Sequence, residues 1–177
     1  MEESVALNDM HVTVEKGGDH LKNSTEFVVR EAIPEDCPII LFGAEVFWKE
    51  SVYSHMTFDE EKMWDRIITY MTMEDKRLFI LSHEGSPAGA LFASLGPTFC
   101  GIDDDLLAFE ETCYVLPEAR SQGGFALLLD AFEAWALGAG AKALVFDITS
   151  QIKTRRTEEK LEARGYEYAG ATLVKRI

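Results

Sequence analysis

The chain has 177 residues, 47% of them apolar, and its 17 basic and 31 acidic side chains give a formal net charge of −14 at pH 7. This length and apolar fraction favour one domain with a sizeable core. The charge argues against nucleic acid and anionic membranes as partners and favours a cationic one, although much of it has a simple role in solubility.

No apolar run approaches the roughly 20 residues that cross a bilayer, and the acidic start MEESVALND does not resemble a signal peptide, so we expect a cytoplasmic protein. Cys37, Cys100 and Cys113 have neither CxxC nor metal-ligand spacing, which indicates buried free thiols. The histidines form no metal-binding pattern either. We therefore expect no metal cofactor.

Residues 1–25 are polar and without periodicity, which predicts a flexible arm suited to a protein partner, followed by one domain over 26–177. A strand is expected at Phe27–Arg30. Pro34, with two acids after it, starts a helix that runs to about Lys49. A second helix begins at the N-cap Asp59.

Two apolar runs around the turn sequence at 84–87 predict a hairpin of residues 77–82 and 88–95. The pattern then predicts a strand at 106–115, a helix at 121–138, a buried strand at 143–148, a charged helix at 154–164 and strands at 166–169 and 172–176. The fold class is α/β (α+β): a mixed sheet flanked by helices, in the order β-α-α-β-β-β-α-β-α-β-β.

The junction between the strand 106–115 and the helix after it carries the most specific pattern. Residues 120–124, RSQGG, lie where the first-turn N–H groups of a helix have no internal partners, so this loop can bind a phosphate group. Glycine lets the backbone approach closely. A plain strand–loop–helix connection is the alternative.

The stretch 114–123, YVLPEARSQG, resembles the acyl-CoA loop of the GCN5-related N-acetyltransferases (GNAT). Residues 29–36, VREAIPED, are similar to the family's first strand and helix entry, and 161–166, LEARGY, to its closing helix and turn. A weaker likeness to acetyltransferase-like proteins of tailed phages lies at 49–51, 132–136 and 140–141, which would place the protein in a host cytoplasm or a virion.

The resemblance implies acetyl-CoA as co-substrate. It assigns the pantetheine arm to the backbone of Val115. It implies that the pyrophosphate binds to the loop residues Arg120, Ser121, Gln122, Gly123, Gly124 and Phe125. Phe125 departs from the family's glycine or alanine, and its bulk could crowd the phosphates. Ser121 replaces a common glycine, but its hydroxyl can itself bind phosphate.

Amine acetylation needs a group that deprotonates an ammonium with a pKa near ~10. Strict alternation puts Glu111 on one face of its strand with Phe109, Cys113 and Val115, an otherwise apolar wall that would raise its pKa. Glu111 is therefore our candidate base, against a simple salt-bridge role. Glu110 is the second candidate, since a bulge there would exchange the faces of the two acids.

Two further segments bear on the site. Leu161 stands where many relatives have the tyrosine that protonates the thiolate, and Tyr166 matches a packing aromatic, although a CoA thiolate can leave without a strong acid. Residues 153–156, KTRR, could meet the CoA phosphates or be a solvated helix start.

Tyr53, His55 and Phe58 lie in the loop where the family usually shapes its acceptor site; His55 could equally be a surface residue. The expected function is acetyl transfer from acetyl-CoA to a small-molecule or peptide amine by direct attack, and the acidic surface favours a cationic amine. The rival is an inactive GNAT-fold protein with a structural or regulatory role, such as a phage particle component. A homo-oligomer, or a protein partner bound through the arm, is compatible with either function. Acetylation of charged RNA is a third reading, disfavoured by the acidic balance.

Overall fold

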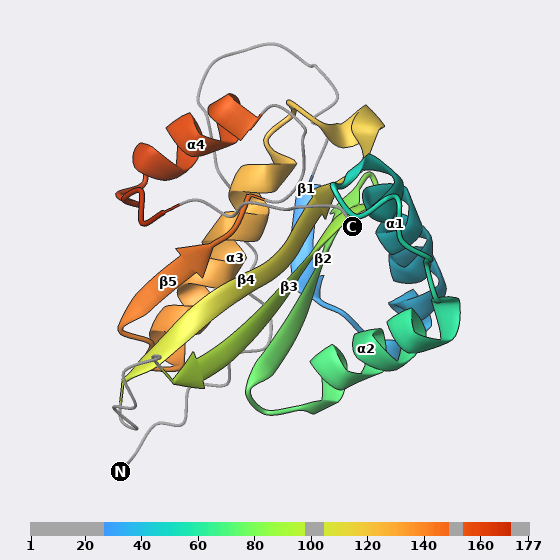
Figure 1. Cartoon of the computed structure of the whole chain (residues 1–177), viewed down its shortest axis with the longest axis horizontal. Helices are drawn as coiled ribbons and strands as arrows, with labels where there is room; N and C mark the ends of the chain where they lie inside the picture. The colour runs from blue at the N-terminus through green and yellow to red at the C-terminus, as the bar shows by residue number, and fades with distance from the viewer. Residues whose placement is uncertain (1–26, 98–104, 149–153, 171–177) are drawn as a thin grey trace.

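The computed structural model describes residues 27–97, 105–148 and 154–170 (Figure 1). The predicted arm at 1–25, Cys100, Lys153 and the predicted strand at 172–176 lie outside these ranges.

The described residues form five strands and four helices, with short 3-10 turns at Pro34–Asp36 and Pro117–Ala119. The strands are β1 (Phe27–Glu31), β2 (Lys76–His83), β3 (Ser86–Pro97), β4 (Leu106–Val115) and β5 (Ala143–Phe146). The helices are α1 (Cys37–Glu50), α2 (Glu60–Thr72), α3 (Gly124–Gly138) and α4 (Thr154–Glu162).

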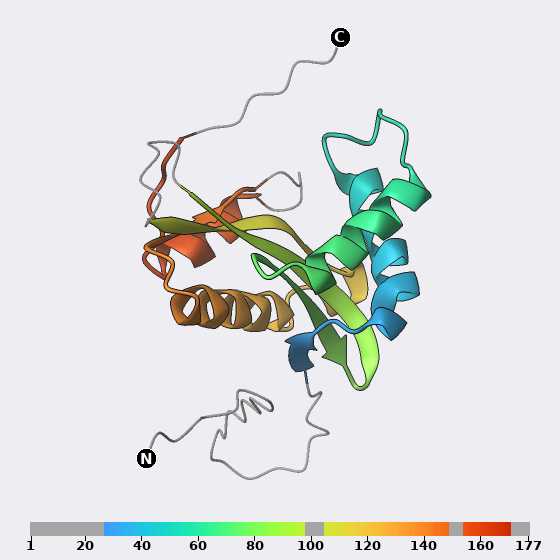
Figure 2. The same ribbon diagram turned by 90° about the horizontal axis from the view of Figure 1, so that it is seen from below.

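The sheet has the order β1-β2-β3-β4-β5, in which the first four strands are antiparallel and β5 runs parallel to β4. Helices α1 and α2 cover one face, and α3 covers the other (Figure 2). This arrangement confirms the predicted fold class: a mixed sheet flanked by helices.

Local sequence accounts for the predicted element starts. Asp59 caps α2 by accepting a hydrogen bond from the N–H of Lys62 at 3.1 Å, and Ile67 and Tyr70 of that helix are buried as expected. The β2–β3 turn consists of Glu84 and Gly85, both with positive φ, 51° and 76°. Such a two-residue turn matches the twist of its strands, so the hairpin is tighter than the sequence suggested.

The core has two parts, one on each face of the sheet. On the α3 face, Leu128 and Phe132 pack against Leu81 and Leu91, and all four are fully buried. On the other face, helices α1 and α2 bury Cys37, Ile40, Ile67 and Tyr70 against Leu78, Ile80 and Phe92. Packing on both faces holds the middle of the sheet rigid, including the part of β4 that faces the cavities described below.

A β-bulge interrupts β4 at Glu111. Phe92 of β3 pairs with Thr112 and Ala93 pairs with Glu110, so Glu111 is the additional residue. Cys113 and Val115 therefore pack on the α3 side, whereas Glu111 faces α2. The expectation that Glu111 shares a face with Cys113 and Val115 was wrong, because simple alternation does not continue through a bulge.

The other departures lie near β5. This strand pairs with β4 only from Leu107–Ala143 to Glu110–Phe146, so the strands separate from Glu111 onward (Figure 1). None of the β5 residues is buried, in contrast to the prediction, because β5 is the edge of the described sheet. Residues 166–169 do not form the predicted strand, since no neighbouring strand in the described ranges pairs with them.

Candidate active site

The loop between β4 and α3 presents free backbone donors. Gly123 caps α3 with φ of 103°, and Ser121 also has a positive φ, 70°. The N–H groups of residues 121–125 donate to no backbone oxygen of the described residues. These donors, at the positive end of a 15-residue helix, form a suitable anion-binding site.

A cavity of about 130 Å³ opens at this loop. Its lining joins the gap between β4 and β5 to the start of α3 and to one side of α4. Among the predicted cofactor residues it includes Val115, Arg120, Ser121, Gly123 and Phe125. We refer to it as the cofactor cavity.

Two cations of α4 face the cofactor cavity. Arg156 donates a hydrogen bond to the Ser121 hydroxyl at 3.2 Å, and the Lys160 ammonium lies 5.5 Å from the centre of the Phe125 ring. Burial, followed by the charges of Arg156 and Arg164, lowers the pKa of Lys160. Closely spaced cations at a helix N-terminus are favourable for a ligand with several phosphate charges. Arg156 comes from the run 153–156 that the sequence singled out.

The side chain of Arg120 is engaged inside the protein. It donates to the carbonyl oxygen of Val115 at 2.8 Å and forms an ion pair with Glu50 at 2.5 Å. The buried Tyr114 hydroxyl donates to Glu50 at 2.7 Å and accepts from Arg120 at 2.8 Å. Arg120 lowers the pKa of Glu50, and burial raises the pKa of Tyr114. This cluster ties the end of α1 to β4 and the loop.

Glu110 is a buried carboxyl group that lines the cofactor cavity. It is 4% exposed, and its Oε2 has no hydrogen-bond partner among the described residues. Burial raises the pKa of Glu110 well above the usual range, and the charges of Asp147 and Glu111 act in the same direction, whereas a hydrogen bond from the Asp147 N–H acts against it. This setting favours the neutral form of the carboxyl group.

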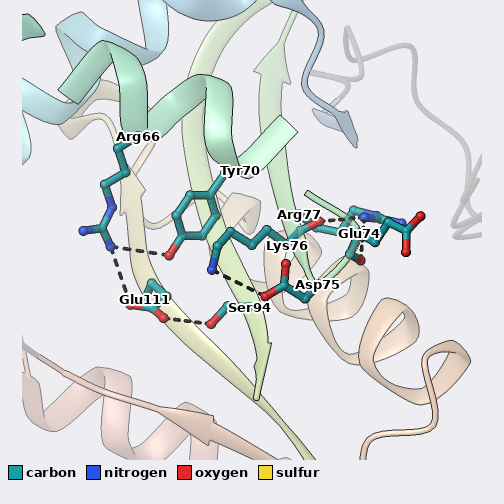
Figure 3. Close-up of polar contacts among 8 residues, drawn as sticks. All are labelled: Arg66, Tyr70, Glu74, Asp75, Lys76, Arg77, Ser94 and Glu111. Atoms are coloured by element: carbon teal, nitrogen blue, oxygen red, sulfur yellow. Dashed lines mark hydrogen bonds and ion pairs between the residues drawn. The ribbon is translucent and has the colours of Figure 1, made fainter. Parts of the chain in front are cut away.

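Glu111 has a polar setting instead of the apolar wall that the sequence predicted. Ser94 donates a hydrogen bond to its Oε1 at 2.7 Å, and the Arg66 guanidinium lies 3.5 Å from its Oε2 (Figure 3). Its side chain is 36% exposed. A carboxyl group in this position is accessible to a ligand in the space between β4 and α2.

A second cavity, of about 450 Å³, lies between β4 and the α1–α2 pair, and we call it the acceptor cavity. Glu111 and Arg66 line it together with Tyr53 and Phe58 from the α1–α2 loop. His55 does not line it. The exposed His55 ring contacts the Val52 carbonyl at 3.0 Å instead.

Three predicted residues have surroundings that differ from the simplest expectation. The Gln122 side chain donates to the Glu118 carbonyl at 2.8 Å and does not line the cofactor cavity. Gly124 is buried, and a Cβ there would lie 2.5 Å from Leu81, so this glycine serves the packing of α3 on the sheet. Phe125 packs edge-on against Phe146, with ring centres 5.8 Å apart.

Neither of the two closing-segment residues considered as the thiolate acid offers an exposed proton donor. Leu161 is buried, as expected of a core residue. The Tyr166 hydroxyl is also buried and has no hydrogen-bond partner among the described residues, and burial with the neighbouring Glu133 charge raises its pKa.

Sequence reasoning missed two groups of the site. Glu50 is the last residue of α1. A negative charge is unfavourable at the C-terminal end of a helix, and this unfavourable placement was a signal that Glu50 has a cationic partner. Arg66 lies three residues after Met63 and four before Tyr70, which puts it on the inward side of α2. Each signal could have been found in the pattern.

Comparison with known families decides the assignment. Residues 43–157, more than half of the chain, match the model of the acetyltransferase (GNAT) family. The chain belongs to the acetyltransferase (GNAT) family. A comparison with curated proteins found no match.

Solved structures agree with this assignment at the level of the fold. Aminoglycoside N-acetyltransferase AAC(6')-Iy in complex with CoA is 16% identical with a TM-score of 0.70, covering 89% of this chain and 99% of its own. AAC(6')-Ih from Acinetobacter baumannii is 16% identical at a TM-score of 0.66, covering 86% and 98%. A transcriptional regulator from Bacillus halodurans C-125 is 14% identical at 0.67, covering 86% and 100%. At these identities the likeness establishes the shared fold.

In this GNAT protein the two cavities are neighbours, because Phe47 and Tyr114 line both. The described ranges contain no helix long and apolar enough to span a membrane. They also contain no group of three or more His, Cys, Asp or Glu side chains placed to hold a metal ion.

Proposed function

We propose that the protein transfers an acetyl group from acetyl-CoA to an amine by direct attack of the amine on the thioester. One observation carries this proposal. The opening between β4 and β5 has the anion-binding loop at one end and Glu111 at the other, where it adjoins the acceptor cavity. A cofactor and an acceptor can therefore meet across β4.

The cofactor would bind along the separated part of β4. Its phosphates would accept hydrogen bonds from the loop N–H groups and pair with Arg156 and Lys160. Residues 111–115 span about 13 Å at ~3.3 Å per residue, which gives an extended pantetheine arm a row of backbone groups to pair with. Its thioester end would then lie near Glu111.

Glu111 is the proposed proton acceptor. Its side chain is accessible and lines the acceptor cavity beside the point where β4 and β5 separate. Attack by the neutral amine forms a tetrahedral oxyanion, for which unpaired N–H groups of β4 are available donors. Collapse of this intermediate then releases the CoA thiolate.

Burial raises the pKa of Glu110 and so favours its neutral form over the ionised form that a base needs. The same property suits it to the opposite role. A protonated carboxyl group in the cofactor cavity can return a proton to the departing thiolate, in place of the tyrosine that Leu161 replaces.

The test is thiol release from acetyl-CoA in the presence of an amine panel, with mass detection of the acetylated product. We expect Glu111→Gln to lower kcat by about 100-fold, the usual contribution of a general base, with acetyl-CoA affinity unchanged. Gln keeps the shape and the Ser94 hydrogen bond. Equal turnover by wild type and Glu111→Gln would remove Glu111 from the mechanism.

One observation favours a second candidate, a descendant with a structural or regulatory role. Arg120, the arginine of the loop pattern, is committed to Glu50 and Val115 instead of facing a ligand. Such a protein would acetylate no amine, whether or not it binds acetyl-CoA, whereas the enzyme would bind acetyl-CoA through the loop backbone and α4 and turn it over. The amine panel, run beside a titration with acetyl-CoA, separates the two.

A further inference from the structure

The acceptor cavity contains one pair of opposite charges. Arg66 of α2 and Glu111 of β4 are the charged residues that line it among the described residues. They come from two different elements and form an ion pair, with Arg66 Nη2 3.5 Å from Glu111 Oε2. The formal charges of the lining residues therefore sum to zero, whereas the chain as a whole is acidic.

The guanidinium of Arg66 lies over the Tyr70 ring, 5.4 Å from its centre, and its polar contacts are long. Its contacts with Glu111 and with the Tyr70 hydroxyl are both 3.5 Å long, and its side chain is 48% exposed (Figure 3). Both contacts use the same nitrogen, Nη2. The other N–H groups of the fork remain available to a ligand, and the geometry of such a fork matches a carboxylate.

Glu111 has one carboxyl oxygen that is available to bind a cation. Ser94 fixes its Oε1 at 2.7 Å, while its Oε2 has the long contact with Arg66 as its partner. An ammonium beside this ion pair could bind Oε2 at hydrogen-bond distance. It would then lie beside the point where the pairing of β4 with β5 ends, which is where the thioester of the proposed cofactor would lie.

The remaining wall is apolar and aromatic. Its lining includes Phe47, Trp48, Tyr53, Phe58, Met63 and Phe92. The Trp48 N–H donates to the Tyr53 carbonyl at 3.1 Å, and the Trp48 and Phe58 rings lie 5.6 Å apart, so the loop side of this wall is held in place. Rigid aromatic walls favour an apolar or aromatic body in the ligand.

We propose that the acceptor is a free α-amino acid with an aromatic or large aliphatic side chain. Its ammonium would pair with Glu111, its carboxylate with Arg66, and its side chain with the aromatic wall. This inference rests on the proposed acetyl transfer and specifies its substrate. A polyamine or an aminoglycoside, with several positive charges, would meet a single carboxylate already opposed by Arg66.

The reaction balances without a further reactant. Glu111 takes one proton from the α-ammonium, and the nitrogen lone pair forms the new C–N bond to the thioester carbon. The C–S bond breaks with its electron pair on sulfur, which takes up a proton, and the amide nitrogen loses its second proton to solvent. The products are an N-acetyl amino acid and CoA.

The experiment compares kcat/KM for matched amines. L-Phenylalanine is paired with phenylethylamine, which lacks the carboxylate, and with spermidine as a polycation. We expect a preference for phenylalanine over phenylethylamine of about 10- to 100-fold, as a charge-assisted bidentate pair would give. Equal use of the two amines, or a preference for spermidine, would overturn the inference.

Variants of Arg66 test the assignment of the carboxylate. Arg66→Gln should reduce kcat/KM for phenylalanine to the level of phenylethylamine, mainly through KM, and should leave phenylethylamine nearly unaffected. Arg66→Lys should restore part of the loss. A general structural defect would lower kcat/KM equally for both substrates, and that result would count against the role of Arg66.

Arg77 provides the matched control. It lies on β2 and directs its guanidinium to the carbonyls of Lys76 and Glu74, away from Glu111 (Figure 3). Arg77→Gln should leave the preference for phenylalanine intact. A calorimetric titration with acetyl-CoA separates the two levels of failure. Binding of acetyl-CoA without acetylation of phenylalanine overturns this inference alone, whereas absence of binding overturns the proposed function as well.

Discussion

Replacing Tyr114 by phenylalanine removes one hydroxyl group from the cluster that joins α1, β4 and the cofactor loop. The residue is 7% exposed, and its hydroxyl makes two hydrogen bonds, as donor to Glu50 and as acceptor from Arg120. The ring remains in contact with Phe47 and leaves no cavity. The change therefore isolates the two hydrogen bonds.

The magnitude follows from the setting of the partners. A hydrogen bond to a charged group contributes roughly 1.5–3 kcal/mol when it is buried. The side chains of Glu50 and Arg120 are 32% and 20% exposed and still pair with each other, so water and the remaining ion pair replace part of what is lost. We expect the free energy of unfolding to fall by about 1–2 kcal/mol.

Urea unfolding followed by circular dichroism measures this change, and a double-mutant cycle with Glu50→Gln isolates the coupling, for which we expect about 1 kcal/mol. Tyr168→Phe is the control, because Tyr168 is 77% exposed, and its expected change is within about 0.5 kcal/mol. A loss for Tyr114→Phe no larger than that of the control would refute the reasoning.

Two other predictions concern β4. Gly89→Ala should destabilise the protein by about 1–3 kcal/mol in the same assay, because the added Cβ would lie 2.5 Å from the Tyr114 carbonyl oxygen in the paired strand; Gly43→Ala, where a Cβ meets nothing within 4 Å, should not. Glu110→Gln should change the pH dependence of stability. The raised pKa of Glu110 means that its stabilising contribution is complete below the unfolded pKa and is lost as pH rises through the folded one. The free energy of unfolding, measured from pH 5 to 9, should therefore rise for the variant relative to wild type as the pH increases. A difference that stays constant with pH would contradict the burial argument.

The sequence was sufficient for most of the fold because its signals are local. The Asp59 cap and the apolar spacing of α2 depend on neighbours within two turns, and the structure has both as predicted. The loop 120–124 was recognisable because a strand, glycines and an amphipathic helix follow each other directly.

The bulge at Glu111 could not be placed from the sequence, because it depends on the register between β3 and β4. It determines which acid is buried and which faces the acceptor cavity, so the burial expected of Glu111 is found at Glu110 instead. The contacts of Glu50 with Arg120 and of Arg66 with Glu111 join residues 70 and 45 positions apart, beyond the reach of pattern reasoning.

Calorimetric titration of acetyl-CoA into the protein tests the central claim most directly. The variant to compare is Arg156→Ala with Lys160→Ala, since Gly124→Glu would force a side chain against Leu81 and disturb the core. Lys62→Ala, on the exposed start of α2, is the control.

We predict a dissociation constant on the order of micromolar for wild type and the control, weakened at least about 10-fold in the double variant because each cation contributes a charge-assisted pair with phosphate. No detectable binding to the folded wild-type protein would contradict the account.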